Sequence, residues 1–325
     1  MRIVTLEDHF VTGMMNEHRA PLPPGGAGGL AARGRKLGHD IGTELLDLTT
    51  SRIAAMDAAG IDVQVVSLSM PGTEAYPAAI AGPMARDAND RLAAAVKEKP
   101  GRLEGLAALP TADPPAAAKE LERAVRALGF KGAMINGRCQ TEYLDDKKFW
   151  PIFEAANALK VPIYLHPREP HPDVMQAYFK GYEELALPAW GFALETCTHF
   201  LRLMMAGVFD AFPDFKLILG HLGEGLPFWL GRLEDHVEGA MRERGLKKNS
   251  TQYLREHVVV TTSGNFYTPA FLCTVMAVGV DNVLFSVDWP FESNKIGRAW
   301  LESLPISDSD KAKLAHGNAE RILRL

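Results

Sequence analysis

The chain has 325 residues, of which 47% are hydrophobic and 23% are charged, and its formal net charge is −5 at pH 7. This composition is typical of a globular protein with a large buried core. Because the sequence contains no run of Lys and Arg that could neutralise phosphates, we expect no nucleic acid as a partner.

Cysteine usage and hydropathy indicate the cellular location to expect for the protein. Cys139, Cys197 and Cys273 are odd in number and show no CxxC spacing, which predicts buried, reduced thiols rather than a disulfide framework or a zinc knuckle. We find no signal-like segment at the amino terminus and no apolar run long enough to span a bilayer. We therefore expect a cytoplasmic protein without membrane contact.

The first apolar run, Ile3 to Leu6, predicts a buried strand that ends in Glu7, Asp8 and His9. Side chains two residues apart on a strand point to the same side, so Glu7 and His9 would leave the strand together, with Asp8 opposite. A carboxylate and an imidazole placed in this way could hold a divalent metal. Taken alone, however, this segment is better explained as a polar turn.

The periodic pattern is lost between residues 11 and 45. Its Gly/Pro-rich part at 22–29 is expected to be irregular, because these residues interrupt both helices and strands. An insertion after the first strand of a barrel would lie over the mouth, which makes this segment a candidate lid. A disordered insertion is the alternative.

Helical and strand-like segments alternate through the rest of the chain. Further strands are expected at 62–68, 103–109, 133–135, 161–166, 216–221, 258–262 and 283–288. Helices are expected at 46–60, 84–99, 114–128, 146–159, 190–209, 226–244 and 269–278, with terminal helices at 316–325. Eight such units predict a (β/α)8 TIM barrel of the α/β class, as one domain over residues 1–325. An open doubly wound sheet is the alternative, but its GxGxxG turn is missing.

Polar residues stand at the carboxyl ends of these strands, where barrel active sites form. A single His at a strand end is usually a hydrogen-bonded structural residue, but several such endings in one chain are hard to explain by coincidence. Mixed carboxylate and imidazole ligands suit Zn²⁺, Mn²⁺ or Fe²⁺. Lys131 stands at the wrong end of its strand to bridge two metals, which favours one. The strand-end residues are Glu7, His9, Asn136, His166, His221, Thr261, Ser263 and Asp288.

At these positions the sequence resembles the amidohydrolase superfamily, in the branch that includes aminocarboxymuconate semialdehyde decarboxylase. Within that branch it is most similar to the hydroxybenzoate decarboxylases of the γ-resorcylate (2,6-dihydroxybenzoate) type. The ExH form at Glu7 and His9 looks like the aromatic acid decarboxylases. The resemblance covers nearly the whole chain and rests on LEDHF at 6–10, NG at 136–137, YLHPR at 164–168, PAWGFA at 188–193, LGHLGEGLP at 219–227, TSGNF at 262–266, DWPFE at 288–292 and GNA at 317–319.

This resemblance implies a metal site and a proton-handling pair. Glu7, His9, His166 and Asp288 would bind one divalent metal ion, Zn²⁺ or Mn²⁺. His221 and Glu224 would form a hydrogen-bonded pair that orients the substrate and assists proton movement. A carboxylate favoured at a helix N-terminus is an alternative, compatible explanation for Glu224.

The resemblance also implies contacts to an aromatic carboxylate substrate. Arg232 would face its carboxylate, and a solvated helix residue paired with Glu234 or Asp235 is the equally weighted alternative. Trp190, Phe291 and Phe266 are candidate walls for an aromatic ring, although core packing explains any one of them as well. Asn136 at the mouth is a further candidate contact. The segments 10–47 and 169–182 match no pattern in these decarboxylases, so the substrate is the least determined feature.

The expected reaction is the non-oxidative decarboxylation of a hydroxylated benzoate, with a metal ion as Lewis acid and template. Asp288, protonated in the complex, would deliver a proton to the ring carbon that bears the carboxylate. The alternative is hydrolysis of a lactone or amide at the same site, with Asp288 as base and His221 polarising the carbonyl. A catalytically inert barrel is a third hypothesis, against which the full ligand set argues. The resemblance implies a homodimer or homotetramer.

Overall fold

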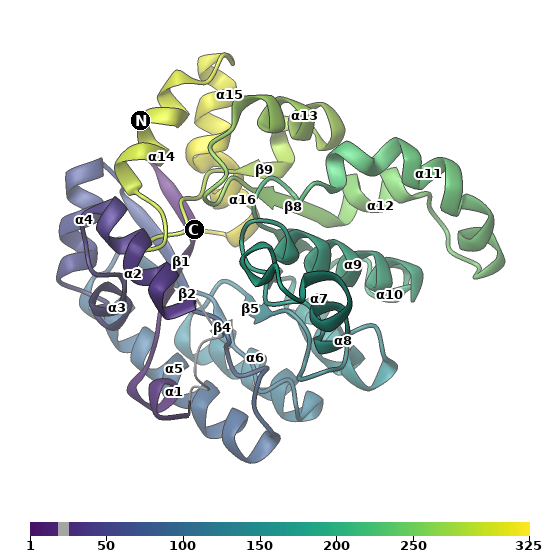
Figure 1. Cartoon of the computed structure of the whole chain (residues 1–325), viewed down its shortest axis with the longest axis horizontal. Helices are drawn as coiled ribbons and strands as arrows, with labels where there is room; N and C mark the ends of the chain where they lie inside the picture. Colours follow the sequence, from purple (N-terminus) through teal and green to yellow (C-terminus); the bar gives the residue numbers. More distant parts are fainter. Residues whose placement is uncertain (19–25) are drawn as a thin grey trace.

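The computed structural model describes residues 1–18 and 26–325, and the side chains of residues 1–18 and 32–325. Strands and helices alternate along the chain and form a parallel (β/α)8 barrel, as the sequence predicts (Figure 1). The strands are β1 Val4–Phe10, β2 Val63–Leu68, β3 Leu103–Gly105, β4 Ala107–Ala108, β5 Ala133–Asn136, β6 Ile163–His166, β7 Leu217–Leu219, β8 Val258–Thr261 and β9 Val283–Leu284.

The strands pair in sequence order, β1-β2-β3 and then β4 to β9. β3 and β4 are two halves of the third barrel strand, and Leu106 between them donates its N–H to Val66 O at 3.0 Å. The ring continues from the last strand to the first, because His9 N donates to Trp289 O at 2.8 Å and Ser286 Oγ donates to Leu6 O. These bonds bring the loop after β9 directly against β1.

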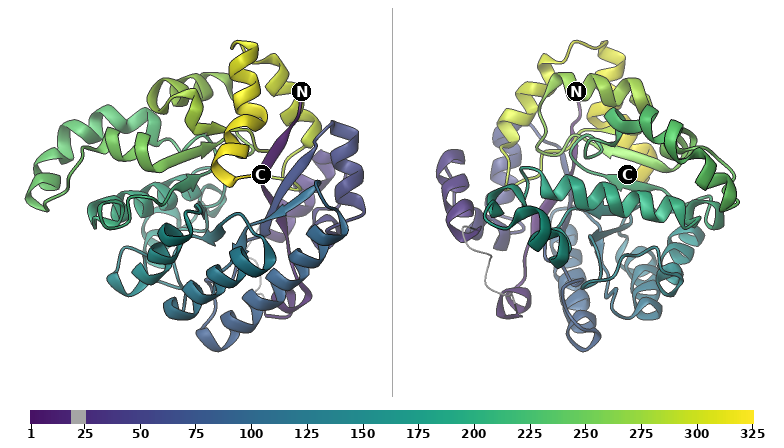
Figure 2. Two further views of the ribbon diagram at one scale, coloured as in Figure 1. Left: turned by 180° about the vertical axis from the view of Figure 1, so that it is seen from behind. Right: turned by 45° about the vertical axis from the view of Figure 1, so that its right-hand side comes forward.

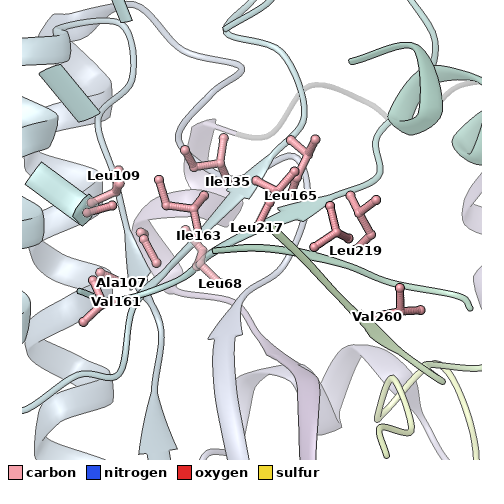
Figure 3. Close-up of a cluster of buried hydrophobic side chains, with 14 of the residues drawn as sticks. Leu68, Ala107, Leu109, Ile135, Val161, Ile163, Leu165, Leu217, Leu219 and Val260 are labelled. Carbon is pink, nitrogen blue, oxygen red and sulfur yellow. The ribbon is translucent and has the colours of Figure 1, made fainter. Parts of the chain in front are cut away.

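The core consists of an inner and an outer apolar layer, because successive strand residues face opposite sides. The outer layer packs under the helices, and ten of its side chains are labelled in Figure 3. Each of the eight barrel strands contributes to the inner layer, which holds Val4, Leu6, Val63, Val65, Leu106, Met134, Tyr164, Ile218, Val259 and Leu284.

Figure 2 shows the helices on the outside of the strands. Short helices lie between β1 and β2, and two π-helical turns occur at Met175–Phe179 and Lys313–Gly317. The α-helices are α1 Gly13–His18, α2 Gly26–Leu37, α3 Ile41–Leu46, α4 Ser51–Ala59, α5 Ala78–Glu98, α6 Pro114–Leu128, α7 Trp150–Leu159, α8 Pro172–Val174, α9 Gly191–Met205, α10 Val208–Ala211, α11 Leu226–Glu243, α12 Ser250–His257, α13 Thr268–Val278, α14 Asn294–Ser303, α15 Asp308–Ala312 and α16 Asn318–Leu323.

Helix boundaries follow local signals where those signals are strong. α6 begins after Asp113, whose side chain accepts a hydrogen bond from Ala116 N, and Pro114 takes the first turn. It ends at Gly129, which adopts a left-handed conformation with φ 77°. The predicted range 114–128 is therefore confirmed. Gly60, with φ 66°, ends α4 in the same way.

Several expectations about individual elements were wrong. α2 begins at Gly26, so the glycines at 26–29 are helical rather than irregular; residues 22–25 lie outside the described residues. The helix predicted at 190–209 is divided at Gly207, which has φ 84°. Cys139 is buried as expected, but Cys197 and Cys273 are only half-buried.

Three helices near the end of the chain were not predicted. α12 precedes β8 and begins with a capping box in which Asn249 and Gln252 satisfy each other's backbone N–H groups. α14 begins after Ser293, whose side chain accepts from Ile296 N, and α15 follows Ser307. All three start with a polar cap that the sequence contains.

Among the described residues, no helix combines the length and apolar character needed to cross a membrane.

Asn318 connects the start of the last strand to the turn before it: it is 2% exposed and donates through Nδ2 to Val280 O and Val283 O, both at 2.8 Å. Asn318→Ala should lower the free energy of unfolding by about 1–3 kcal/mol, because it leaves the buried carbonyl of Val283 and the partly buried carbonyl of Val280 without this donor. Urea unfolding at equilibrium measures the loss. The exposed control Lys119→Ala should change the value by less than about 0.5 kcal/mol; equal values for both variants would contradict the assignment.

Candidate active site

A β-bulge in β1 places Glu7. The pairing with β2 runs from Thr5 opposite Gln64 to Asp8 opposite Val66, so Leu6 and Glu7 together oppose a single residue. Glu7 has φ 57°, a left-handed conformation. Leu6 belongs to the inner apolar layer, so strict alternation would have turned Glu7 outward. The bulge turns Glu7 inward, to the same side as His9. The prediction that both side chains point the same way is therefore right, but its cause is the bulge and not the alternation of strand residues.

The predicted strand-end residues converge at the mouth of the barrel. Glu7 Oε1 lies 3.2 Å from His166 Nε2 and 3.5 Å from His221 Nε2. His9 Nε2 lies 3.2 Å from Asp288 Oδ1, and the rings of His9 and His166 meet edge to face with centroids 4.8 Å apart. Five side chains from four separate segments of sequence therefore meet at one point.

The donor set at this point fits a divalent metal ion. Ligand atoms of Glu7, His9 and His166 all lie within 4.8 Å of one another, and all three residues are buried. Glu7 Oε1, His9 Nδ1 and His166 Nδ1 are buried without a hydrogen-bond partner among the described residues. Unpaired polar atoms are costly in a protein interior, and a cation coordinated by oxygen and nitrogen would satisfy them. Asp288, in contact with His9, is the adjacent fourth candidate ligand.

The two acids in the site are shifted in opposite directions. Burial raises the pKa of Glu7, but the charge of His221 and the contact with His166 outweigh it and hold the pKa below its ordinary value. Burial and the neighbouring charge of Glu7 raise the pKa of Asp288 well above its ordinary value. These surroundings favour the anion at Glu7 and the protonated acid at Asp288. Two carboxyl groups whose pKa values are shifted apart are typical of active sites in which one group donates a proton and the other remains charged.

The two histidines also differ. Burial and the nearby charge of His166 lower the pKa of His9 well below its ordinary value, which favours the neutral ring that binds metals. Burial lowers the pKa of His221, but the charges of Glu224 and Glu7 outweigh burial and raise this pKa well above its ordinary value. His221 Nδ1 lies 2.6 Å from Glu224 Oε1, so the expected hydrogen-bonded pair is present.

Left-handed backbone marks the loops that carry these residues. φ is 51° at His221, 56° at Glu224 and 74° at Asp288. Residues other than Gly and Asn rarely adopt this region and do so at a cost of order 1–3 kcal/mol, mostly at functional sites. β7 ends at Leu219, so His221 is placed by the following turn rather than by the strand itself.

The loop after Asp288 is fastened from two sides. Asp8 faces away from the mouth, as predicted; its Oδ1 accepts from Trp289 N at 3.3 Å and its Oδ2 from Thr5 Oγ1 at 2.5 Å. Arg52 donates to His9 O at 2.6 Å and stacks over the Trp289 ring at 4.5 Å. Asp8 was expected opposite the two candidate ligands, and its contact with this loop was not predicted.

The segment from α2 to α3 also contacts this loop. Arg33 Nε donates to Phe291 O at 3.0 Å, and its guanidinium pairs with Glu292. His39 Nε2 lies 2.9 Å from Pro290 O. Arg33 and His39 were missed because they lie in the stretch without periodicity, where no pattern indicated a partner.

The candidate substrate contacts differ in where they lie. Asn136 stands opposite His166 in the strand register and is 2% exposed. The Phe291 ring packs edge-on against His9 with centroids 5.6 Å apart. Both therefore lie at the site. Phe266 instead packs on Trp300 in the outer layer, with centroids 5.6 Å apart, so its expected place in the wall is not supported.

Arg232 and Trp190 are exposed, Trp190 by 58%. Within the described residues Arg232 makes no ion pair, neither with a site residue nor with the expected Glu234 or Asp235. Glu234 instead accepts hydrogen bonds from Asn249 and Thr251. The structure does not bring Arg232 or Trp190 into contact with the site residues.

Comparison with known proteins gives concordant results. The amidohydrolase family model matches residues 36–325. The chain is 39% identical over 332 residues to gamma-resorcylate decarboxylase from Polaromonas sp. JS666, covering 99% of this chain and 98% of the relative. It is 38% identical over 332 residues to the protein of the same name from Rhizobium radiobacter, with the same coverage of 99% and 98%.

Two solved structures are similar over the whole chain. One is 2,6-dihydroxybenzoate decarboxylase complexed with 2,6-dihydroxybenzoate, with a TM-score of 0.89 and 36% identity, covering 100% of this chain and 99% of the other. The second is dihydroxybenzoic acid decarboxylase from Polaromonas sp. JS666 with bound manganese and the inhibitor 2-nitroresorcinol. Its TM-score is 0.90 at 37% identity, with 100% and 97% of the two chains covered.

A further buried acid, Glu74, lies beside the site. Glu74 is 1% exposed, and its carboxyl and the Asn136 amide both crowd Gly72, where a Cβ atom would meet Glu74 Oε2 at 2.1 Å and Asn136 Nδ2 at 2.4 Å. Burial raises the pKa of Glu74 to about 7, and hydrogen bonds and the charge of Arg168 offset the effect only in part.

This shift makes folding stability depend on pH. Because folded Glu74 holds its proton up to about pH 7 and the unfolded chain only to about 4.5, stability falls as pH rises through that window. Glu74→Gln, which mimics the protonated acid, should remove this fall and be more stable than wild type by up to roughly 3 kcal/mol above it.

Urea unfolding at about pH 5 and about pH 8 measures the effect. The difference between wild type and Glu74→Gln should widen at the higher pH, while the exposed control Glu243→Gln should follow wild type at both. A constant difference would show that ionisation of Glu74 has no part in stability.

Proposed function

We build our proposal on the fact that this chain belongs to the amidohydrolase family, and we propose that it is a metal-dependent, non-oxidative decarboxylase of a hydroxylated benzoate. The observation that carries the proposal is the convergence of Asp288 with a buried, metal-compatible cluster of Glu7, His9 and His166 in one barrel mouth, where Asp288 Oδ1 lies 3.2 Å from His9 Nε2. Whole-chain similarity to 2,6-dihydroxybenzoate decarboxylases supports the same reaction.

Glu7, His9, His166 and Asp288 would hold one divalent cation, Mn²⁺ or Zn²⁺. When bound, the cation supplies Lewis acidity and a template for the substrate carboxylate and its ortho hydroxyl. Manganese is the ion bound in the similar structure from Polaromonas sp. JS666, and the imidazole ligands suit either metal.

Asp288 is the proton donor in this proposal. Burial and the charge of Glu7 keep its proton in place until an electron-rich ring lies against it. The proton passes to the ring carbon that bears the carboxylate and makes that carbon tetrahedral. The bond to the carboxylate then breaks, its electron pair returns to the ring, and CO₂ leaves. Asp288 is left ionised and regains a proton from water.

Other side chains orient the substrate. The positive His221, held by Glu224 at 2.6 Å, offers a hydrogen bond and charge to an anionic oxygen of the substrate. Phe291, which packs against His9, and Asn136 would contact the ring and its hydroxyl group. Contacts from Arg232 and Trp190 remain predictions, as do a cytoplasmic location and a homodimeric or homotetrameric assembly.

We also propose that the chain is one barrel domain whose segment 11–45 covers the mouth. This is supported by the contacts that Arg33 and His39 make with the three residues at 290–292, close behind Asp288. A cover of this kind would exclude water from the proton transfer.

A substrate panel tests the reaction. The purified protein with Mn²⁺ should release CO₂ from 2,6-dihydroxybenzoate or a related hydroxybenzoate and yield the corresponding phenol. The hydrolytic alternative predicts ring-opened acid from a lactone panel and no CO₂. Chromatography and CO₂ detection on the same incubations separate the two, and hydrolysis without decarboxylation would overturn the proposal.

Asp288→Asn should abolish CO₂ release, lowering kcat at least about 10²-fold, because the amide has no acidic proton to give. Asn keeps the size of the side chain, so a non-reactive phenolic acid should still bind, as isothermal titration calorimetry would show. The exposed control Asp308→Asn should retain wild-type kcat. A fully active Asp288→Asn variant would exclude Asp288 as the donor.

Removal of the metal should abolish activity reversibly. A chelator should leave a folded chain that releases no CO₂, and addition of Mn²⁺ or Zn²⁺ should restore turnover at one equivalent per chain. Elemental analysis together with CO₂ release makes the measurement and ranks the two metals. Full activity at strongly sub-stoichiometric metal content would contradict a metal-dependent reaction.

A further inference from the structure

A chain of buried hydroxyl groups lies beneath Glu7. Tyr164 projects from β6 into the inner layer of the barrel, and its hydroxyl group is hydrogen-bonded to Glu7 Oε2. The hydroxyl oxygen of Tyr164 lies 2.7 Å from Thr261 Oγ1 and 3.3 Å from Ser263 Oγ, and the Thr261 and Ser263 oxygens are 2.6 Å apart. All four residues are fully buried.

The donors in this chain have one consistent direction. A carboxylate only accepts hydrogen bonds, so Tyr164 donates its single hydroxyl hydrogen to Glu7. The Tyr164 oxygen can then only accept, which makes Thr261 its donor, and Ser263 in turn donates to Thr261. Hydroxyl groups aligned in this way polarise one another and strengthen the last bond, which is the one to the carboxylate.

The backbone leaves room for this contact at Gly220. A Cβ atom at this position would meet Glu7 Oε2 at 2.8 Å, the Tyr164 hydroxyl at 3.0 Å and Glu7 Oε1 at 3.3 Å. Any side chain here would therefore displace the carboxylate or the phenol. Gly220 directly precedes His221, so the turn that carries His221 also preserves the space for the Tyr164 to Glu7 bond.

We propose that Tyr164 is a positioning residue for the metal site: its hydroxyl group occupies Glu7 Oε2 and thereby presents Oε1 alone to the cation. Oε1 is the atom that lies 3.2 Å from His166 Nε2 and lacks a hydrogen-bond partner among the described residues. The inference rests on the proposed role of Glu7 as a ligand. Partners that orient a ligand in this way usually matter for metal affinity 10–100-fold.

The test is metal affinity, measured by competition between the chain and a chelator for Mn²⁺. Tyr164→Phe removes the hydroxyl group and keeps the ring, and it should bind Mn²⁺ about 10–100-fold more weakly. Tyr253→Phe is the matched control, because Tyr253 is also fully buried and its hydroxyl accepts from Lys247 N at 3.1 Å, in another part of the fold. It should keep wild-type affinity.

Variants at two further positions test the same bond without altering Tyr164. Thr261→Val breaks the chain of donors and should weaken Mn²⁺ binding, whereas Thr261→Ser retains a hydroxyl group and should restore it. Gly220→Ala places a methyl group against Glu7 and should weaken binding as well. With Co²⁺ as a probe, the visible absorption of the Tyr164→Phe complex should differ from that of wild type, since the orientation of a ligand has changed.

Wild-type Mn²⁺ affinity in Tyr164→Phe would overturn the inference. Should that variant not fold, equal affinities of Thr261→Val and Thr261→Ser would overturn it instead. Because the readout is metal binding, a wild-type chain that binds Mn²⁺ but releases no CO₂ contradicts the proposed function alone. A wild-type chain that binds no Mn²⁺ overturns this inference too.

Discussion

The buried negative charge of Glu7 is the constraint on which the rest of the site depends. A carboxylate in a barrel interior is tolerated only when charges and hydrogen bonds compensate for lost hydration. His166 and His221 approach one oxygen, and Tyr164 approaches the other. These partners come from β6 and from the turn after β7, so one charge holds two neighbouring strands of the mouth against β1. The bulge in β1 interrupts the regular pairing with β2 and thereby turns the charged side chain of Glu7 into the barrel.

The same charge separates the roles of the acids. The histidines around Glu7 favour its ionised form, whereas burial and the charge of Glu7 favour the protonated form of Asp288. A site with one permanent anion and one available proton can both bind a cation and protonate a carbon atom. Left-handed conformations at Glu7, His221 and Asp288 accompany this arrangement, and the loops around them are fixed by buried hydrogen bonds such as those of Asp8 and Arg52.

Much of the site could be predicted because barrels gather strand ends. Once eight strands were placed, residues as distant in sequence as His9 and Asp288 were expected at one mouth, and they lie in contact. The pair of His221 and Glu224 was expected from a family resemblance and is present. Arg232 and Trp190 came from the same resemblance and lie exposed, because motif similarity does not determine where a side chain on a helix or loop points.

The sequence by itself determined the order of the strands and the identity of the residues at the strand ends, because these follow from local periodicity and from chain connectivity. Only the tertiary structure decided how the side chains meet. The inward turn of Glu7 depends on pairing between β1 and β2, and its contact with Tyr164 depends on a strand far along the chain. Asp8 fastens the loop after Asp288 for the same reason. Register shifts and long-range hydrogen bonds leave no periodic trace, so they become visible only when the barrel is closed.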